Sequence, residues 1–158
     1  MRGGATMKPS NFEFARATSL AEAATILRQA AGSARVVAGG QSLGPMLNLR
    51  LVQPSILVDI TAIPELTHID EDGDGVIVGA CVTTSDIEDG RVRVEELPIL
   101  ASVAAGVAYR AVRNRGTIGG SIAMPTQRAI GCRRCARWPQ NASLPTAAAP
   151  AAYRSTNS

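Results

Sequence analysis

The segment Arg35-Val-Val-Ala-Gly-Gly-Gln-Ser-Leu43 runs from apolar residues directly into two glycines and a serine. Short apolar runs that end in glycine are typical of buried strands followed by a tight loop. A strand is predicted on one side at 12–15, before a helix that starts at the capping sequence Ser19-Leu-Ala-Glu22. A further strand is predicted on the other side at 56–60. This alternation of strands and helices predicts a small parallel sheet over residues 12–60.

The next part of the chain has a different pattern. Two apolar runs between residues 66 and 82 flank the polar, glycine-containing turn at 70–75, which predicts a hairpin. The sequence Ser85-Asp-Ile-Glu88 predicts a second helix start with a capping box. An Ala/Val-rich helix is predicted at 97–108, and a second glycine-rich loop follows at 114–121.

The two glycine-rich loops are the strongest candidates for a binding site. Glycines allow backbone N–H groups to converge, and converging N–H groups with a hydroxyl form an anion-binding nest. One Gly-Gly pair after a strand is more often only a tight turn. Two such loops, each ending in serine, suit the two phosphates of a pyrophosphate. Neither loop has the Rossmann or P-loop spacing.

Composition and charge exclude several classes of protein. Among the 158 residues, 46% are hydrophobic and 18% charged, which indicates a globular protein, and with 3% aromatics the core must consist of Ala, Val, Ile and Leu. Residues 1–123 carry 11 basic and 13 acidic side chains, so nucleic-acid binding is disfavoured. No apolar run approaches the roughly 18 residues of a membrane span, and the N-terminal residues lack a signal-peptide pattern. Three cysteines form no disulfide framework, and a cytoplasmic location is expected.

Several sequence blocks occur in an order that resembles a known family. The blocks are Thr18-Ser-Leu-Ala-Glu-Ala, Arg35-Val-Val-Ala-Gly-Gly-Gln-Ser-Leu, Pro45-Met-Leu-Asn-Leu-Arg-Leu, Leu57-Val-Asp-Ile and Val112-Arg-Asn-Arg-Gly-Thr-Ile-Gly-Gly-Ser. Over residues 8–123 the chain resembles the FAD-binding medium subunit of molybdenum hydroxylases, the xanthine dehydrogenase and carbon monoxide dehydrogenase group.

The resemblance implies a fold, a cofactor and partners. The fold is α+β and incomplete, of the FAD-binding type shared with the vanillyl-alcohol oxidase group (the PCMH type), with a small α/β lobe at 8–62 and the start of an antiparallel lobe at 63–123. The family flavin takes electrons from iron–sulfur clusters and passes them to an acceptor, in a complex with a molybdopterin large subunit and a [2Fe–2S] small subunit. No side chain of this chain is expected to be catalytic or to bind a metal, because the cofactor carries the chemistry. The residues expected to hold the FAD pyrophosphate are Val37, Ala38, Gly39, Gly40, Gln41, Ser42, Leu43, Thr117, Ile118, Gly119, Gly120 and Ser121.

Other motifs favour structural roles. The Asp70-x-Asp-x-Asp stretch opens like a calcium loop, but Cys81 stands at its twelfth position, so a hairpin turn is favoured. Cys132 and Cys135 form a lone C-x-x-C pair, whereas a zinc site needs two further ligands. His68 is interpreted as a surface residue of a strand. For the arginines at positions 110, 113 and 115, a role near phosphates and a solvated face are equally favoured.

Residues 124–158 depart from the family. They contain five arginines, four prolines and no acid, and a non-family, disordered tail is expected. The family continues with a His- or Asn-Ala-Asp-Pro-Ala-x-Asp segment and further strands that supply flavin contacts, so weak FAD binding is expected. Two alternatives stay open: an inactive, frameshifted fragment that binds no ligand, and a subunit-interaction module.

The coding DNA tests the frameshift hypothesis. Met-Pro-Thr-Gln-Arg-Ala-Ile-Gly, residues 124–131, can be encoded by ATG CCG ACC CAG CGC GCG ATT GGN, one choice among the synonymous codons. With one C restored in front, the same bases read His-Ala-Asp-Pro-Ala-Arg-Asp-Trp, the segment that the resemblance expects. We predict that the DNA beyond codon 123, shifted by one base, opens into a long frame that continues the flavin subunit. A shifted reading frame that soon reaches a stop codon contradicts the hypothesis.

Overall fold

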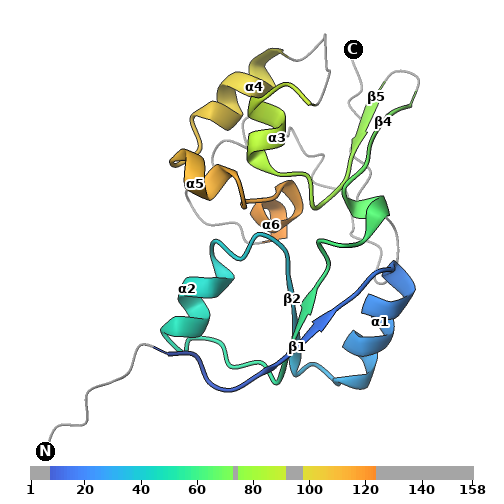
Figure 1. The fold of residues 1–158 in the computed structure, drawn as a ribbon, viewed down its shortest axis with the longest axis vertical. Helices are drawn as coiled ribbons and strands as arrows, with labels where there is room; N and C mark the ends of the chain where they lie inside the picture. The colour runs from blue at the N-terminus through green and yellow to red at the C-terminus, as the bar shows by residue number, and fades with distance from the viewer. Residues whose placement is uncertain (1–7, 73–74, 92–97, 124–158) are drawn as a thin grey trace, which may run out of the picture.

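Three parallel strands form the sheet of the first lobe in the computed structural model, which describes residues 8–72, 75–91 and 98–123. The strands are β1 (Glu13–Arg16), β2 (Ala34–Val37) and β3 (Ile56–Asp59), and β3 lies in the middle. Phe14 is in register with Leu57, and Arg35 with Leu57 on the other edge. The predicted parallel sheet and the mixed helix-and-strand class are therefore confirmed (Figure 1).

Helix α1 (Leu20–Gln29) connects β1 to β2 and starts where the capping sequence predicts. The Ser19 hydroxyl accepts a hydrogen bond from the Glu22 N–H at 3.2 Å. The Glu22 carboxylate reaches back to the N–H of Thr18 at 2.8 Å rather than to that of Ser19, and this bond lowers the Glu22 pKa. The helix ends before Gly32, whose φ of +87° suits glycine.

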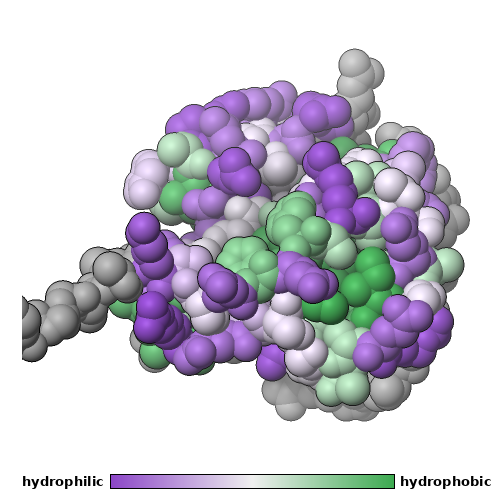
Figure 2. Space-filling view, turned by 60° about the horizontal axis from the view of Figure 1, so that its bottom comes forward, coloured by the Kyte–Doolittle hydropathy of each residue, from purple (hydrophilic) through white to green (hydrophobic). Residues whose placement is uncertain are grey.

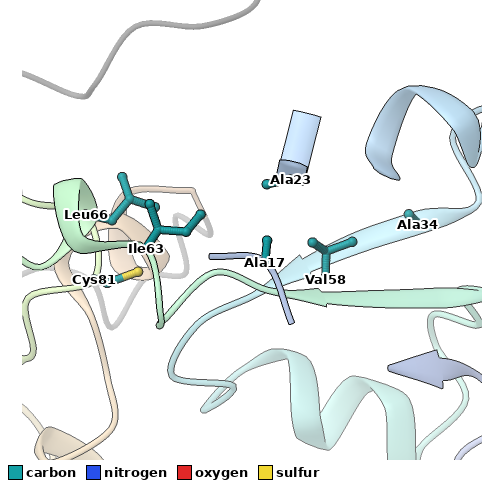
Figure 3. Packing of buried hydrophobic residues seen from close by; sticks show 7 residues of the cluster. All are labelled: Ala17, Ala23, Ala34, Val58, Ile63, Leu66 and Cys81. Atoms are coloured by element: carbon teal, nitrogen blue, oxygen red, sulfur yellow. The ribbon is translucent and has the colours of Figure 1, made fainter. Parts of the chain in front are cut away.

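The core is built mainly from small residues and extends from the first lobe into the second. Ala17, Ala23, Ala34 and Val58 pack between α1 and the sheet, which lets the helix backbone come close to the strands. Ile63, Leu66 and Cys81 continue the same cluster into the second lobe (Figure 3). The two lobes therefore share one hydrophobic core.

Helix α2 (Leu43–Asn48) lies on the other side of the sheet from α1 (Figure 1). Leu47 of α2 is buried, and so is Leu57 of β3. The next residue of β3, Val58, lies on the opposite face of the sheet, toward α1. Both faces of the central strand are thus covered. Apolar side chains also remain on the surface, among them Phe14 and Leu51, and Figure 2 shows hydrophobic areas set among hydrophilic residues.

The second lobe begins with the 3₁₀ helix η1 (Pro64–Leu66) and the antiparallel hairpin of β4 (Ile69–Asp72) and β5 (Gly75–Val78). The hairpin is confirmed, but its strands are shorter than the predicted span of 66–82. The first apolar residue of that span, Leu66, lies in η1, where it points into the shared core. At the other end, β5 stops before Gly79. The Gly79 backbone lies so close to the Leu66 carbonyl group that there is no room for a Cβ at this position.

Four short helices complete the described part of the second lobe: α3 (Thr84–Glu88), α4 (Pro98–Ala105), α5 (Arg110–Arg113) and α6 (Ile118–Ala123). The predicted start of α3 at Ser85 is wrong. Thr83 is the N-cap and forms a capping box with Asp86, while Ser85 is buried inside the helix. Helix α4 agrees with the helix predicted at 97–108, of which residue 97 lies outside the described residues. Across the residues described, no helix has the length and apolar character needed to span a membrane.

The shared core makes one residue a sharp test of the fold. Ile63 is fully buried, so Ile63→Ala should lower the free energy of unfolding by about 2–5 kcal/mol. Leu51, which is 68% exposed, provides the control. Leu51→Ala should change the free energy of unfolding by less than about 0.5 kcal/mol. Urea denaturation of both variants measures the difference. Equal effects would show that the two lobes do not share a core.

Candidate functional site

The first glycine-rich loop joins β2 to α2. Gly40 has a φ of +69°, a conformation that other residues rarely adopt. Within the described residues, the backbone N–H groups of residues 39–42 donate to no backbone or side-chain acceptor, and the Ser42 hydroxyl forms no cap. Gly39 and Gly40 are half-buried, where N–H groups are normally paired, while Gln41 and Ser42 are exposed. The four N–H groups are therefore available as donors to an anion.

The second glycine-rich segment is predicted to be an open loop. In the structure most of it forms the first turns of α6 instead. Its N–H groups have acceptors inside the chain: Ile118 donates to the Val82 carbonyl at 3.1 Å, and Gly119 to the Ala80 carbonyl at 2.9 Å. Gly120 donates to the Thr117 hydroxyl at 3.2 Å. Gly119 also sits so close to Ala80 that a Cβ would lie 2.7 Å from the Ala80 Cβ. These glycines fix α6 against the strand end, and the open donors belong to the first loop.

The structure brings the two segments together at Gly39. A Cβ on Gly39 would lie 2.7 Å from the Arg115 carbonyl carbon and would overlap the Arg115 carbonyl oxygen. Only glycine allows this approach of the two backbones. The first loop therefore lies directly beside Arg115 and Gly116, the two residues before Thr117.

A backbone bridge holds the second segment in place. Thr83 and Thr117 form an isolated antiparallel bridge, in which the Thr84 N–H donates to the Gly116 carbonyl at 2.8 Å. Because Thr83 is also the N-cap of α3, the start of that helix and the start of α6 share one anchor.

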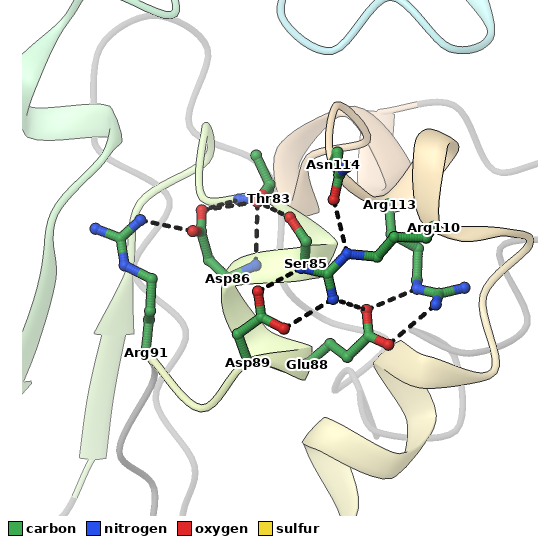
Figure 4. A network of polar contacts seen from close by, with 9 residues as sticks. All are labelled: Thr83, Ser85, Asp86, Glu88, Asp89, Arg91, Arg110, Arg113 and Asn114. Atoms are coloured by element: carbon green, nitrogen blue, oxygen red, sulfur yellow. Dashed lines mark hydrogen bonds and ion pairs between the residues drawn. The ribbon is translucent and has the colours of Figure 1, made fainter.

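Ion pairs fasten α5 to α3 (Figure 4). Arg113 binds the Glu88 carboxylate with two nitrogens, at 2.8 and 3.0 Å, and its side chain is only 12% exposed. Arg110 binds both Glu88 and Asp89 and donates to the Asn114 amide oxygen at 2.9 Å. The hypothesis of a phosphate role is therefore not supported for Arg110 and Arg113, and neither has a merely solvated side chain: both hold α5 and the turn that leads to Arg115.

These contacts shift the titration of the carboxylates. Hydrogen bonding to Arg113 lowers the pKa of Glu88, and hydrogen bonding to Arg110 lowers that of Asp89. Burial acts to raise the pKa of Asp86, but hydrogen bonds from Thr83 and the ion pair with Arg91 outweigh it and lower the pKa. All three groups are charged at neutral pH.

A cleft of about 450 Å³ opens where the two lobes meet. Three of the predicted site residues line it: Ala38, Gly39 and Thr117. The other predicted residues do not line the cleft. The remaining lining residues, which the motif analysis did not assign to the site, are Thr61, Thr67, Ile69, Cys81, Val82, Thr83, Asp86, Arg91, Asn114 and Arg115.

Cys81 is the lining residue with the most altered chemistry. Burial, with a smaller effect of the Asp59 charge, raises its pKa to about 11. Its thiol lies 3.6 Å from the Ile60 carbonyl oxygen. The thiol is thus protonated at neutral pH and belongs to the core, as predicted.

No group of three or more potential metal ligands occurs among the residues that the structure describes. His68 is exposed, as predicted, but it is not a strand residue, because β4 begins at Ile69. The Cys132/Cys135 pair and the tail at 124–158 lie outside the described residues, as do residues 73 and 74 of the turn at 70–75.

The sequence and the fold were compared with known proteins. A model of the "FAD binding domain in molybdopterin dehydrogenase" matches residues 10–147, a range that extends past residue 123 into the segment set apart by its composition. The chain belongs to this family.

Individual relatives agree with the family match. The chain is 44% identical over 117 residues to the carbon monoxide dehydrogenase medium chain of Hydrogenophaga pseudoflava, and 40% identical to the 6-hydroxypseudooxynicotine dehydrogenase complex subunit alpha of Paenarthrobacter nicotinovorans. Each match covers 74% of this chain. The chain spans about two fifths of the length of these relatives, 41% and 40% respectively.

Solved structures match the fold as well. The carbon monoxide dehydrogenase of Hydrogenophaga pseudoflava superposes with a TM-score of 0.70 at 44% identity, and quinoline 2-oxidoreductase from Pseudomonas putida 86 with 0.69 at 44% identity. Each match covers 73% of this chain and 40% of the other chain. This FAD-binding domain therefore has the fold of its molybdenum hydroxylase relatives.

The residues present fit the diphosphate part of FAD. The N–H groups of the first loop have no acceptor among the described residues, Gly40 has a positive φ, and the contact of Gly39 with Arg115 leaves no room for a side chain at position 39. These are the features that an anion cradle needs.

The contact between the loops predicts opposite effects for two nearby glycines. Gly39→Ala forces the loop away from Arg115 and should lower the free energy of unfolding by about 1–3 kcal/mol. Gly44, in α2, has open space around its Cβ position, so Gly44→Ala should be neutral or stabilise by up to about 1 kcal/mol. Thermal and urea unfolding check both. A Gly39→Ala protein as stable as the Gly44→Ala protein would contradict the contact.

The Glu88–Arg113 pair predicts a pH effect. Because its folded-state pKa is lowered, Glu88 contributes stability above its ordinary pKa of 4.5, and this contribution is lost as the pH falls through the lowered value. Glu88→Gln should therefore be less stable than the wild type at pH 7, and the gap should narrow on acidification. Glu65→Gln, at an exposed site outside this cluster, is the control. A gap that stays constant with pH would contradict this account.

Proposed function

We propose that this domain holds FAD by its diphosphate and carries electrons within a molybdenum hydroxylase complex. The observation that carries the proposal is the meeting of the donor-rich first loop with the second segment at Gly39, beside the cleft between the lobes. Bound FAD would supply the redox chemistry, since it accepts and releases electrons.

The protein's own residues would bind and orient the cofactor. In this proposal the N–H groups of residues 39–42 donate to phosphate oxygens, and the Ser42 hydroxyl adds a donor at the start of α2. The second segment, 117–121, acts mainly by positioning the first, because most of its N–H groups are engaged within the chain. No side chain takes part in the reaction as an acid, a base or a nucleophile.

The partners are part of the same proposal. A molybdopterin large subunit would oxidise the substrate, and a [2Fe–2S] small subunit would deliver electrons to the flavin, which passes them to an external acceptor in the cytoplasm. Relatives named as a "medium chain" and a "complex subunit" support an assembly of several subunits.

A flavin titration of the full chain tests FAD binding. We expect a weak but saturable change in flavin fluorescence for the wild type. Gly40→Val should abolish it, because valine does not tolerate the φ of +69° that turns the loop. Gly120→Val should also abolish it, because a Cβ there would come within 2.9 Å of the Thr117 hydroxyl and displace it.

Gly44→Ala is the matched control, since it changes a glycine just beyond the loop without a steric conflict. Circular dichroism shows whether each variant is folded. Folded loop variants that bind FAD as the wild type does would show that the glycine segments are only turns. A wild-type chain that binds no FAD would favour the alternative of a fragment without a ligand.

A further inference from the structure

Arg115 is the charged residue at the cleft that has no partner within the described part of the chain. Three charged residues line the cleft: Asp86, Arg91 and Arg115. Asp86 and Arg91 form an ion pair at 2.7 Å and neutralise one another. The Arg115 guanidinium makes no hydrogen bond or ion pair with the described residues, and Arg115 is an exposed residue at the edge of the cleft.

The other arginines that the structure describes in the second lobe all have carboxylate partners, unlike Arg115. Arg91 pairs with Asp86, Arg110 with Glu88 and Asp89, and Arg113 with Glu88. Each has thus found a carboxylate. Arg115 follows directly on this cluster, since Asn114 before it is held by Arg110.

The position of Arg115 is fixed relative to the donor row. Its carbonyl group touches Gly39, the first residue of the N–H donors at 39–42. The bridge between Thr83 and Thr117 secures the residues that follow it. A cation and a row of amide donors, none of which has a partner among the described residues, therefore lie on two backbone segments in contact with one another.

We infer that Arg115 is a cofactor-binding residue, which contacts the diphosphate together with the N–H groups of residues 39–42; for the identity of the dinucleotide, this inference rests on the proposed function. A guanidinium presents two parallel N–H donors that match two phosphate oxygens. The FAD diphosphate offers terminal acceptor oxygens on two phosphorus atoms, whereas FMN offers them on one, so simultaneous contacts from Arg115 and the loop favour FAD over FMN.

Calorimetric titration of the full chain with inorganic pyrophosphate, FAD and FMN tests the inference. Loss of one charge-assisted contact should weaken the binding of pyrophosphate and FAD to Arg115→Gln by about tenfold to a hundredfold. The preference for FAD over FMN should shrink. The affinity of the variant should also fall less steeply with added salt, because one screened interaction is gone.

Two further variants test whether the weaker binding is specific to the guanidinium of Arg115. Arg28→Gln removes an exposed arginine of α1 that hydrogen-bonds only to the Thr25 hydroxyl, and it should leave all affinities unchanged. Arg115→Lys keeps the charge but not the paired donors, so it should keep the salt dependence and bind with intermediate affinity.

The outcomes separate this inference from the proposed function. A wild type that binds pyrophosphate but not FAD, with weaker pyrophosphate binding in Arg115→Gln, supports the inference and contradicts the proposed function. A wild type that binds FAD, with unchanged affinity in folded Arg115→Gln and Arg115→Lys, overturns the inference alone. A wild type that binds neither ligand overturns both.

Discussion

The approach of the Gly39 backbone to the Arg115 carbonyl group is the constraint on which the arrangement of the site depends. It is possible only because residue 39 lacks a Cβ. On one side of it lie the sheet and the loop with unpaired N–H groups. On the other side, the Thr83–Thr117 bridge and the ion pairs of α3 and α5 hold Arg115 in place. The proposed anion site thus depends on two lobes that share a core and meet at Gly39.

The first lobe could be predicted from the sequence because its signals are local. Apolar strands, the capping serine at position 19 and the glycines after Val37 each determine their own surroundings, and the resemblance to the family agreed with them. The role of the second segment could not be predicted in this way. Two glycines in a row suggest an open loop, but Gly119 and Gly120 lie in a helix whose first N–H groups bind Ala80 and the Thr117 side chain. That arrangement depends on a strand end nearly forty residues away.

The start of α3 shows a second limit of local reasoning. Thr83 and Ser85 both stand three residues before an acid, so the sequence offers two overlapping capping boxes. The structure uses Thr83, because its bridge with Thr117 keeps it extended, with φ of −83° and ψ of 158°. Glu88, the acid of the other box, is taken by Arg113. The same pairing explains why the roles of Arg110, Arg113 and Arg115 could not be separated from the sequence: three similar arginines differ only in which carboxylates the fold brings near.

The alanine-rich packing between α1 and the sheet also bears on how the domain responds to temperature. Methyl groups of Ala17, Ala23 and Ala34 remove little apolar surface from water per residue, compared with leucine or phenylalanine. Since the heat-capacity increment of unfolding grows with the apolar surface that becomes exposed, it should be small for this lobe. A small heat-capacity increment makes the free energy of unfolding change only slowly with temperature. The stability of this lobe should therefore have a broad, low maximum and fall only gradually on heating or cooling.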